Sequence, residues 1–252
     1  MIKEISPNQA LSDLKLYFRW RVQRAAKLVA LAKRYCQLND KNILEVGCGF
    51  GPIAANLNPK KSKIYSIDPS IKSLALFKKF NPDKKINVKI ANNENLPFVK
   101  SFFEVIFSFD SFEHVKNPNK SMQEMSRVLK KNGYLFLEAT PYFSLIAGHH
   151  LYNFTLLPAQ FLPKKFIKWL IFKKKAYQIR SPQDAWETFI SLNKISINKI
   201  KKLAIMNKFK IIEENYIIKI PSLLEIKINW IKYLPIFREL LTMSYQLILQ
   251  KN

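Results

Sequence analysis

Three glycines at alternate positions follow a short apolar stretch, and this pattern constrains the fold more than any other feature. The apolar residues 43–46 are expected to form a buried strand, and Gly47, Gly49 and Gly51 come directly after it. The chain has only 5 glycines, so most of them are concentrated in this loop. Glycine adopts positive φ and lets the backbone approach a ligand closely. Because residues 53–57 are expected to start a helix, the loop is predicted to deliver a ligand to a helix N-terminus.

A carboxylate, Asp68, ends the next apolar run. At the tip of a second strand, a carboxylate can accept hydrogen bonds from ribose hydroxyls. The dinucleotide fingerprint Gly-x-Gly-x-x-Gly/Ala fails when counted from Gly47, because Pro52 takes its last position. Counted from Gly49 it is met by Ala54, but that frame leaves the first glycine unused. The loop and the acid therefore indicate a nucleoside-binding α/β fold, with a tight turn that binds nothing as the alternative.

The chain is strongly basic, with a formal net charge of +24 from 42 Lys and Arg against 18 Asp and Glu. An AT-rich genome, whose codons favour Lys, Asn and Ile, would explain this charge by composition alone. Contact with an anionic membrane surface has equal weight. Nucleic acid ranks third as a partner and is not expected, because the sequence contains no recognised nucleic-acid-binding module.

The compartment follows from cysteine usage and hydropathy. Cys36 and Cys48 have no metal-ligand spacing and suggest no disulfide framework. The first residues lack the apolar core of a signal peptide, and no uncharged apolar run reaches about 18 residues. We therefore expect a cytoplasmic protein, and peripheral attachment to a membrane stays open as a second expectation.

The glycine loop, read as Glu-x-Gly-x-Gly-x-Gly from Glu45 to Gly51, resembles motif I of the class I S-adenosylmethionine-dependent methyltransferases. Residues 96–98, Leu-Pro-Phe, resemble the end of a second family segment, Asp-Ala-Glu-x-Leu-Pro-Phe. Residues 127–135 resemble the family's Arg-Val-Leu-Lys-Pro-Gly-Gly turn, with Lys and Asn in place of the proline and first glycine. The resemblance covers roughly residues 40–140. It looks like the type-11 methyltransferase group, which is similar to quinone-biosynthesis methyltransferases.

The resemblance implies an α/β fold and a cofactor. The fold would be a Rossmann-like, seven-stranded, mostly parallel sheet with helices on both faces and a helical lid inserted after strand five. The cofactor would be S-adenosyl-L-methionine. Asn92 stands where the family has an acid that accepts a hydrogen bond from the adenine amino group, and an amide oxygen can accept that bond too. The implied cofactor-binding residues are Glu45, Gly47, Cys48, Gly49, Gly51, Asp68, Pro69, Asn92, Asn93, Glu94 and Phe109.

Apolar runs and turn residues place the strands within a single methyltransferase domain. Strands are expected near residues 43–47, 63–67, 86–90, 103–108, 134–139 and 209–218, with an antiparallel last strand near 243–249. A helix is expected directly after the glycine loop, near 52–58, and another over 121–130. The domain is divided into an N-terminal helical cover (10–38), a cofactor-binding core (40–140), a helical lid and acceptor region (141–207) and C-terminal strands and helix (208–252). Tyr17 or Trp20 of the cover could line the cofactor site.

Two histidines are candidates for a general base. His114 follows strand four, at the edge of the sheet where ligands bind, and histidine titrates near neutrality. A structural role in that loop is the alternative. With Asp110 and Glu113, His114 also resembles an acid-x-x-Glu-His pattern that binds a divalent metal in quinone-ring O-methyltransferases. A solvated loop is favoured over this site, so no metal is assigned. His150, beside His149 in the expected lid, is the second candidate base.

A basic aromatic stretch, residues 161–175, has two interpretations. On a helix, four apolar residues should face one side and three lysines the other: Phe166, Ile167, Trp169 and Leu170 against Lys164, Lys168 and Lys175. Such a helix can lie in the surface of an anionic membrane. It can also be a lid helix that packs its apolar face on the domain and exposes its lysines, and this second interpretation is slightly favoured.

We therefore expect methyl transfer from S-adenosyl-L-methionine to a small-molecule acceptor, with O-methylation of a lipid-like, quinone or sugar metabolite as the leading case. A non-catalytic S-adenosylmethionine-binding protein is one alternative. A methyltransferase acting on RNA or protein is another. Strand four is not followed by an Asn/Asp-Pro-Pro-Tyr/Phe motif, which argues against methylation of amino groups on bases or glutamine.

Overall fold

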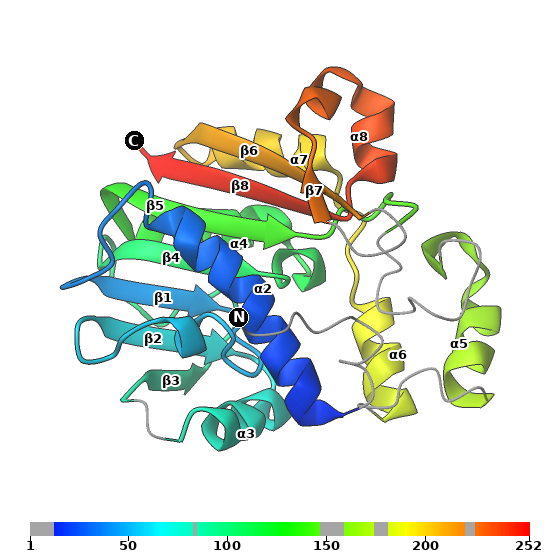
Figure 1. Ribbon diagram of the computed structural model, residues 1–252, viewed down its shortest axis with the longest axis horizontal. Helices are drawn as coiled ribbons and strands as arrows, with labels where there is room; N and C mark the ends of the chain where they lie inside the picture. The colour runs from blue at the N-terminus through cyan, green and yellow to red at the C-terminus, as the bar shows by residue number, and fades with distance from the viewer. Residues whose placement is uncertain (1–12, 83–84, 147–158, 174–180, 220–224) are drawn as a thin grey trace.

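The computed structural model describes residues 13–82, 85–146, 159–173, 181–219 and 225–252. Its centre is an eight-stranded sheet in the order β3-β2-β1-β4-β5-β8-β6-β7 (Figure 1). The five strands from β3 to β5 are parallel, whereas β8, β6 and β7 run antiparallel to their neighbours. The strands are β1 Asn42–Val46, β2 Lys63–Asp68, β3 Asn87–Ile90, β4 Phe103–Phe109, β5 Leu129–Ala139, β6 Phe209–Lys219, β7 Glu225–Lys227 and β8 Ser244–Lys251.

Helices cover both faces of the sheet, as a doubly wound fold requires (Figure 1). One face packs against α2 and α3, whose buried side chains join those of β1, β2 and β4. The other face packs against α4 and α7. Two further helices, α5 and α6, lie beyond the carboxyl ends of the parallel strands (Figure 1). The helices are α2 Leu14–Ala32, α3 Ile71–Phe80, α4 Pro118–Val128, α5 Lys164–Lys173, α6 Pro182–Ile190, α7 Ile197–Met206 and α8 Pro235–Leu241.

The predicted architecture is confirmed, with local differences. The sheet has eight strands instead of seven, because the short β7 extends its edge beside β6. The helix expected after the glycine loop is only a 3₁₀ turn, η1 Ala54–Asn56. Strand five begins at Leu129, five residues early, and its pairing with β4 is irregular before Tyr134. Asn132 has φ 60°, a conformation that Asn tolerates where the family has glycine.

Within the described residues, the N-terminal cover is helix α2, which ends at Ala32, before the predicted end at residue 38. Asp13 caps it by accepting hydrogen bonds from the amides of Lys15 and Leu16. Within the part of the chain that the structure describes, no helix is both long and apolar enough to cross a membrane.

Candidate functional site

The glycine loop has the backbone conformation that its spacing predicts. Gly47, Gly49 and Gly51 have φ of 63°, 52° and 77°, in the left-handed region that disfavours side chains. A Cβ at Gly47 would come within 2.4 Å of the Cβ of Ser111, and one at Gly51 within 2.4 Å of the Phe77 ring. At Gly49 it would meet no described atom within 4 Å. Two of the glycines are therefore required by packing, and the third leaves the backbone open toward a cavity.

Glu45 holds the loop from behind. Its carboxylate is buried and accepts hydrogen bonds from the amides of Ile53 and Ala54, both at 3.2 Å, and from the Ser66 hydroxyl at 3.3 Å. Burial raises the pKa of Glu45 to about 8, against the lowering effect of these bonds. The structure thus places Glu45 behind the cavity, where it fixes the first turn after the loop.

Asp68 lies at the tip of β2 and faces the cavity. One carboxylate oxygen accepts from the Gly49 amide at 2.9 Å, and the other accepts from the Ser70 amide at 2.8 Å. The residue is 8% exposed. Next to it, burial and the charges of Glu45 and Asp68 raise the pKa of the Cys48 thiol, so the thiol is neutral.

The two adjacent asparagines after β3 differ in how their amide oxygens are used. Asn92 is exposed, and its Oδ1 accepts from the Glu94 amide at 2.9 Å. Asn93 is buried, and its Oδ1 has no hydrogen-bond partner among the described residues. A buried acceptor without a partner costs free energy unless a ligand satisfies it. Asn93 is therefore a better candidate than Asn92 to meet a donor in the cavity.

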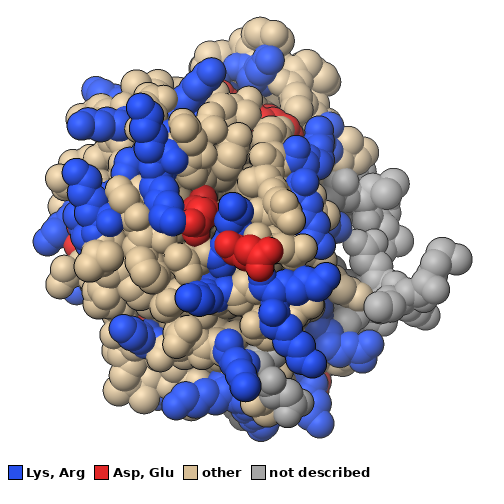
Figure 2. Space-filling model, turned by 90° about the vertical axis from the view of Figure 1, so that its left-hand side faces the viewer, with Lys and Arg blue, Asp and Glu red and all other residues tan. Residues whose placement is uncertain are grey.

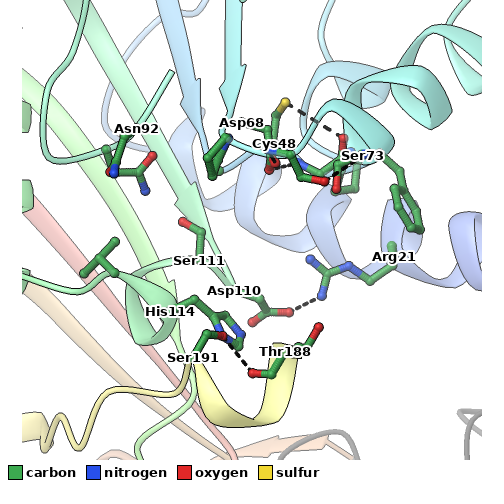
Figure 3. A pocket seen from close by; sticks show the side chains of 18 of the residues that line it. Arg21, Cys48, Asp68, Ser73, Asn92, Asp110, Ser111, His114, Thr188 and Ser191 are labelled. Carbon is green, nitrogen blue, oxygen red and sulfur yellow. Dashed lines mark hydrogen bonds and ion pairs between the residues drawn. The ribbon is translucent and has the colours of Figure 1, made fainter. Parts of the chain in front are cut away.

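The cavity at the carboxyl edge of the sheet has a volume of about 480 Å³, within the usual range of ligand pockets (Figure 3). Three predicted cofactor residues, Glu45, Gly51 and Phe109, do not line it. The predicted residues that do are Tyr17, Gly47, Cys48, Gly49, Asp68, Pro69, Asn92, Asn93, Glu94 and His114, whereas Trp20, the other candidate of the cover, does not. Residues that line it without having been predicted to bind include Arg21, Ser111, Thr188 and Ser191.

A partly buried charge network joins α2 to the floor of this cavity. Asp110 pairs with Arg21 and, at 2.7 Å, with Arg24, and Arg24 also reaches Glu138 at 2.9 Å. Both guanidinium groups lie over the ring of Phe109, at 4.5 and 5.1 Å from its centroid. The ring of Phe109 is therefore covered by Arg21 and Arg24, which explains why Phe109 does not line the cavity. The network holds the covering helix against the ends of β4 and β5.

The acid-x-x-Glu-His pattern does not form a metal site. Among the residues that the structure describes, no group of three or more His, Cys, Asp or Glu is placed to hold a metal ion. Asp110 is engaged by the two arginines, while Glu113 is buried and accepts from the Thr140 amide at 3.3 Å. Burial, reinforced by the charge of Asp110, raises the pKa of Glu113 to about 8. The favoured interpretation of a solvated loop is therefore wrong at Glu113.

Only one of the two candidate bases can be located. His114 lies in the 3₁₀ turn η2 Phe112–His114 and lines the cavity opposite Asp68 (Figure 3). Its Nδ1 is 2.8 Å from the hydroxyl of Ser191, at the end of α6. His149 and His150 lie outside the described residues.

The polar groups of the cavity fit a nucleoside cofactor. The open backbone at Gly49 allows close approach, and the Asp68 carboxylate can accept from hydroxyls. The unpartnered Oδ1 of Asn93 can accept from an amino group. Hydroxyls and an amino group are the donors that an adenosine moiety presents.

Comparison with known proteins supports the same interpretation. Residues 44–137 match the methyltransferase domain family. A ubiquinone biosynthesis O-methyltransferase of Pelagibacter ubique is 30% identical over 188 residues, covering 71% of this chain and 70% of the relative. A tRNA U34 carboxymethyltransferase of Campylobacter curvus is 32% identical over 107 residues, covering 41% of this chain and only 36% of the relative.

Solved structures share the fold over nearly the whole chain. A methyltransferase of Thermotoga maritima aligns with a TM-score of 0.56 and 21% identity, covering 95% of this chain and 96% of that one. A methyltransferase of Mesorhizobium loti aligns with a TM-score of 0.57 and 13% identity, covering 91% and 100%. At these identities the likeness concerns the fold alone.

Proposed function

Because the chain belongs to the class I S-adenosylmethionine-dependent methyltransferases, we propose that it methylates a small-molecule acceptor. The leading case is O-methylation of a lipid-like, quinone or sugar metabolite. One observation carries the proposal: a single cavity is lined both by the glycine loop with Asp68 and by His114 with the end of α6. A cofactor side and an acceptor side thus share one cavity, as a direct transfer between two ligands requires.

When bound, S-adenosyl-L-methionine supplies a methyl group that its sulfonium already activates. The contribution of the chain is therefore mainly positioning, which can account for a large part of a rate enhancement. In our proposal Gly49 offers its backbone to the cofactor, Asp68 accepts hydrogen bonds from the ribose hydroxyls, and Asn93 accepts one from the adenine amino group.

His114 takes the role of general base in this proposal. A hydroxyl acceptor must lose its proton as its oxygen is methylated, and an imidazole nitrogen within hydrogen-bond reach can take that proton. The placement of His114 in the cavity, on the side opposite Asp68, supports this role. General base catalysis typically contributes about 10²–10⁴-fold to a rate.

A small molecule is preferred over RNA as the acceptor for two reasons. The similarity to the ubiquinone biosynthesis O-methyltransferase extends over 70% of that relative, whereas the similarity to the tRNA U34 carboxymethyltransferase extends over 36%. In addition, the sequence contains no recognised nucleic-acid-binding module. Figure 2 shows Lys and Arg dispersed over the face at the amino edge of the parallel strands, which lies away from the cavity at their carboxyl edge.

The direct test uses methyl-labelled S-adenosyl-L-methionine and extracts from cells that lack the gene. The purified protein is incubated with the small-molecule fraction, the lipid fraction and the RNA fraction separately. We expect label in the small-molecule or lipid fraction, and a loss of about 10²–10⁴-fold in kcat for His114→Gln. Label in the RNA fraction alone would overturn the choice of acceptor, and full activity of His114→Gln would overturn the role of the base.

Peripheral contact with an anionic membrane is the second part of the proposal. Helix α5 buries Ile167, Leu170 and Ile171 against α6. Its outward face nevertheless carries Phe166, Trp169 and Phe172, which are 45%, 47% and 40% exposed, beside the exposed lysines Lys164, Lys165 and Lys168. The sequence interpretation was thus wrong about the faces, because it grouped the buried and the exposed apolar residues together.

A second exposed apolar surface lies on η5 Asn229–Tyr233 and α8. Its most exposed members are Trp230, Tyr233, Ile236 and Phe237, and the Lys232 ammonium lies 4.9 Å from the Tyr233 ring centroid. Aromatic residues beside lysines suit the headgroup region of an anionic bilayer. Each lysine near such a surface contributes about 1 kcal/mol.

Vesicle co-sedimentation tests this part. Binding to anionic vesicles is expected at low salt and should fade as salt rises, because the attraction is screened. The double variant Trp169→Ala with Trp230→Ala should bind more weakly, while Ile190→Ala, which removes an apolar residue that is 47% exposed on α6, serves as the matched control. Equal sedimentation with neutral and anionic vesicles would refute the electrostatic attachment.

A further inference from the structure

The end of the lid helix α6 is bonded to the imidazole of His114. The Ser191 hydroxyl is 2.8 Å from Nδ1 of His114 (Figure 3). It also donates to the backbone carbonyl of Thr188 at 2.8 Å. Thr188 belongs to the last turn of α6, where carbonyls lack amide partners within the helix. The hydroxyl therefore serves two groups, one on its own helix and one on the loop after β4.

A serine hydroxyl has one proton and can donate it only once. Since that proton goes to Thr188, the oxygen of Ser191 must accept the bond from His114. Nδ1 then carries the proton of the neutral ring, and Nε2 carries the lone pair. The hydrogen bond at one ring nitrogen thus decides which nitrogen can act as a base.

Asn193, two positions after Ser191, fixes the backbone of the loop that carries His114. The Asn193 amide donates to the Glu113 carbonyl at 2.7 Å. Its side-chain Nδ2 donates to the carbonyls of Phe112 and Val115, both at 2.9 Å. Three carbonyls within residues 112–115 are therefore bound by one residue of the lid segment, which fixes the turn that carries His114.

We propose that Ser191 and Asn193 are positioning residues: Ser191 fixes His114 in the Nδ1–H tautomer and Asn193 fixes the loop that carries it. The inference rests on the proposed function only in assuming that Nε2 of His114 takes the proton of the acceptor. The consequence is that the lid prepares the base, since the Nε2 lone pair is presented only while the end of α6 is docked. Arg21, Asp68, Glu94, Asp110 and Lys116 are the charged groups lining the same cavity, and their charges are unchanged in the variants below.

The test reads the tautomer directly, without any acceptor. The whole protein is labelled with nitrogen-15 and its histidine ring signals are recorded at about pH 8.5, well above the usual histidine pKa. The chain has only 3 histidines, and His114→Gln identifies the signal of interest. We expect the Nδ1–H form in the native protein, a shift toward the Nε2–H form favoured by free histidine in Ser191→Ala, and a return to Nδ1–H in Ser191→Thr.

Two results would overturn the proposal: an Nε2–H ring at His114 in the native protein, or an unchanged Nδ1–H ring in Ser191→Ala. Ser62→Ala is the matched control, because it removes a hydroxyl that donates to a carbonyl far from the cavity. Asn193→Asp, which loses both side-chain donors, should broaden the His114 signal while circular dichroism stays native. If the tautomer shifts as expected but His114→Gln keeps full turnover, the positioning role stands and the general base fails, so the two claims are separable.

Discussion

Replacing Asp68 by Asn tests the cofactor site most sharply, because the change keeps the shape of the side chain and removes its charge. Each carboxylate oxygen already accepts one amide bond, from Gly49 at 2.9 Å and from Ser70 at 2.8 Å. Asp68 also lines the cavity, where its charged oxygens can accept hydrogen bonds from ribose hydroxyls. In Asp68→Asn one of these oxygens becomes an NH₂ group, which cannot accept from either partner.

The magnitude follows from the kind of bond that is lost. A hydrogen bond to a charged group contributes about 1.5–3 kcal/mol. Loss of this contribution raises the Kd for S-adenosyl-L-methionine by about 10- to 150-fold. The effect should be larger on cofactor binding than on folding, because Asp68, although buried, lines the cavity.

Isothermal titration calorimetry with S-adenosyl-L-methionine measures this change, and thermal unfolding monitors the fold in parallel. Asp184→Asn is the matched control, since it removes a carboxylate that pairs with Lys72 at the exposed surface. It should leave the affinity unchanged, because exposed ion pairs contribute little. An affinity of Asp68→Asn equal to that of the native protein would refute the assignment of the ribose.

Three further changes have defined outcomes. Gly49→Ala should cost about 1–2 kcal/mol of unfolding free energy in urea titrations, because its φ of 52° strains a side chain, and it should weaken cofactor binding as well. Arg24→Met should lower the unfolding free energy by about 3 kcal/mol, since it leaves the buried carboxylates Asp110 and Glu138 short of a cation; a loss below 1 kcal/mol would contradict this. The folded-state pKa of Glu45 is raised from 4.5 to about 8, so the native protein loses stability as pH rises through this window. Chemical denaturation across this window should show Glu45→Gln gaining stability relative to the native protein, and parallel pH profiles of the two would refute the shift.

The parts of the site predicted from sequence are those fixed by local chemistry. Positive φ at alternate positions requires glycine, so the ligand-binding loop could be predicted from the glycine spacing. Asp68 could be predicted as well, because an acid at the tip of the next strand must lie beside that loop. The parallel sheet followed from the apolar runs. His114 was located at the correct edge for the same reason, since the carboxyl ends of parallel strands meet there.

Other features depended on contacts that no local pattern contains. Ser191 reaches His114 across 77 positions of sequence, and the lid segment matches no part of the family pattern. The choice between Asn92 and Asn93 depends on which amide oxygen is used by a turn. Phe109 was misassigned because the guanidinium groups that cover it come from α2. In each case a partner from a distant element decided the outcome.

The position of β8 in the sheet has a consequence for how the chain is made. β8 lies between β5 and β6 and pairs with both. In the sequence, however, the 104 residues from 140 to 243 separate β8 from β5. During synthesis on a ribosome, β5 and β6 therefore present unpaired edges until residue 251 has emerged from the exit tunnel. The cofactor loop and its parallel strands can fold early, but the sheet that supports Glu138 and the cavity floor closes only with β8. Nascent chains stalled before this point should be recognised by chaperones that bind open strand edges.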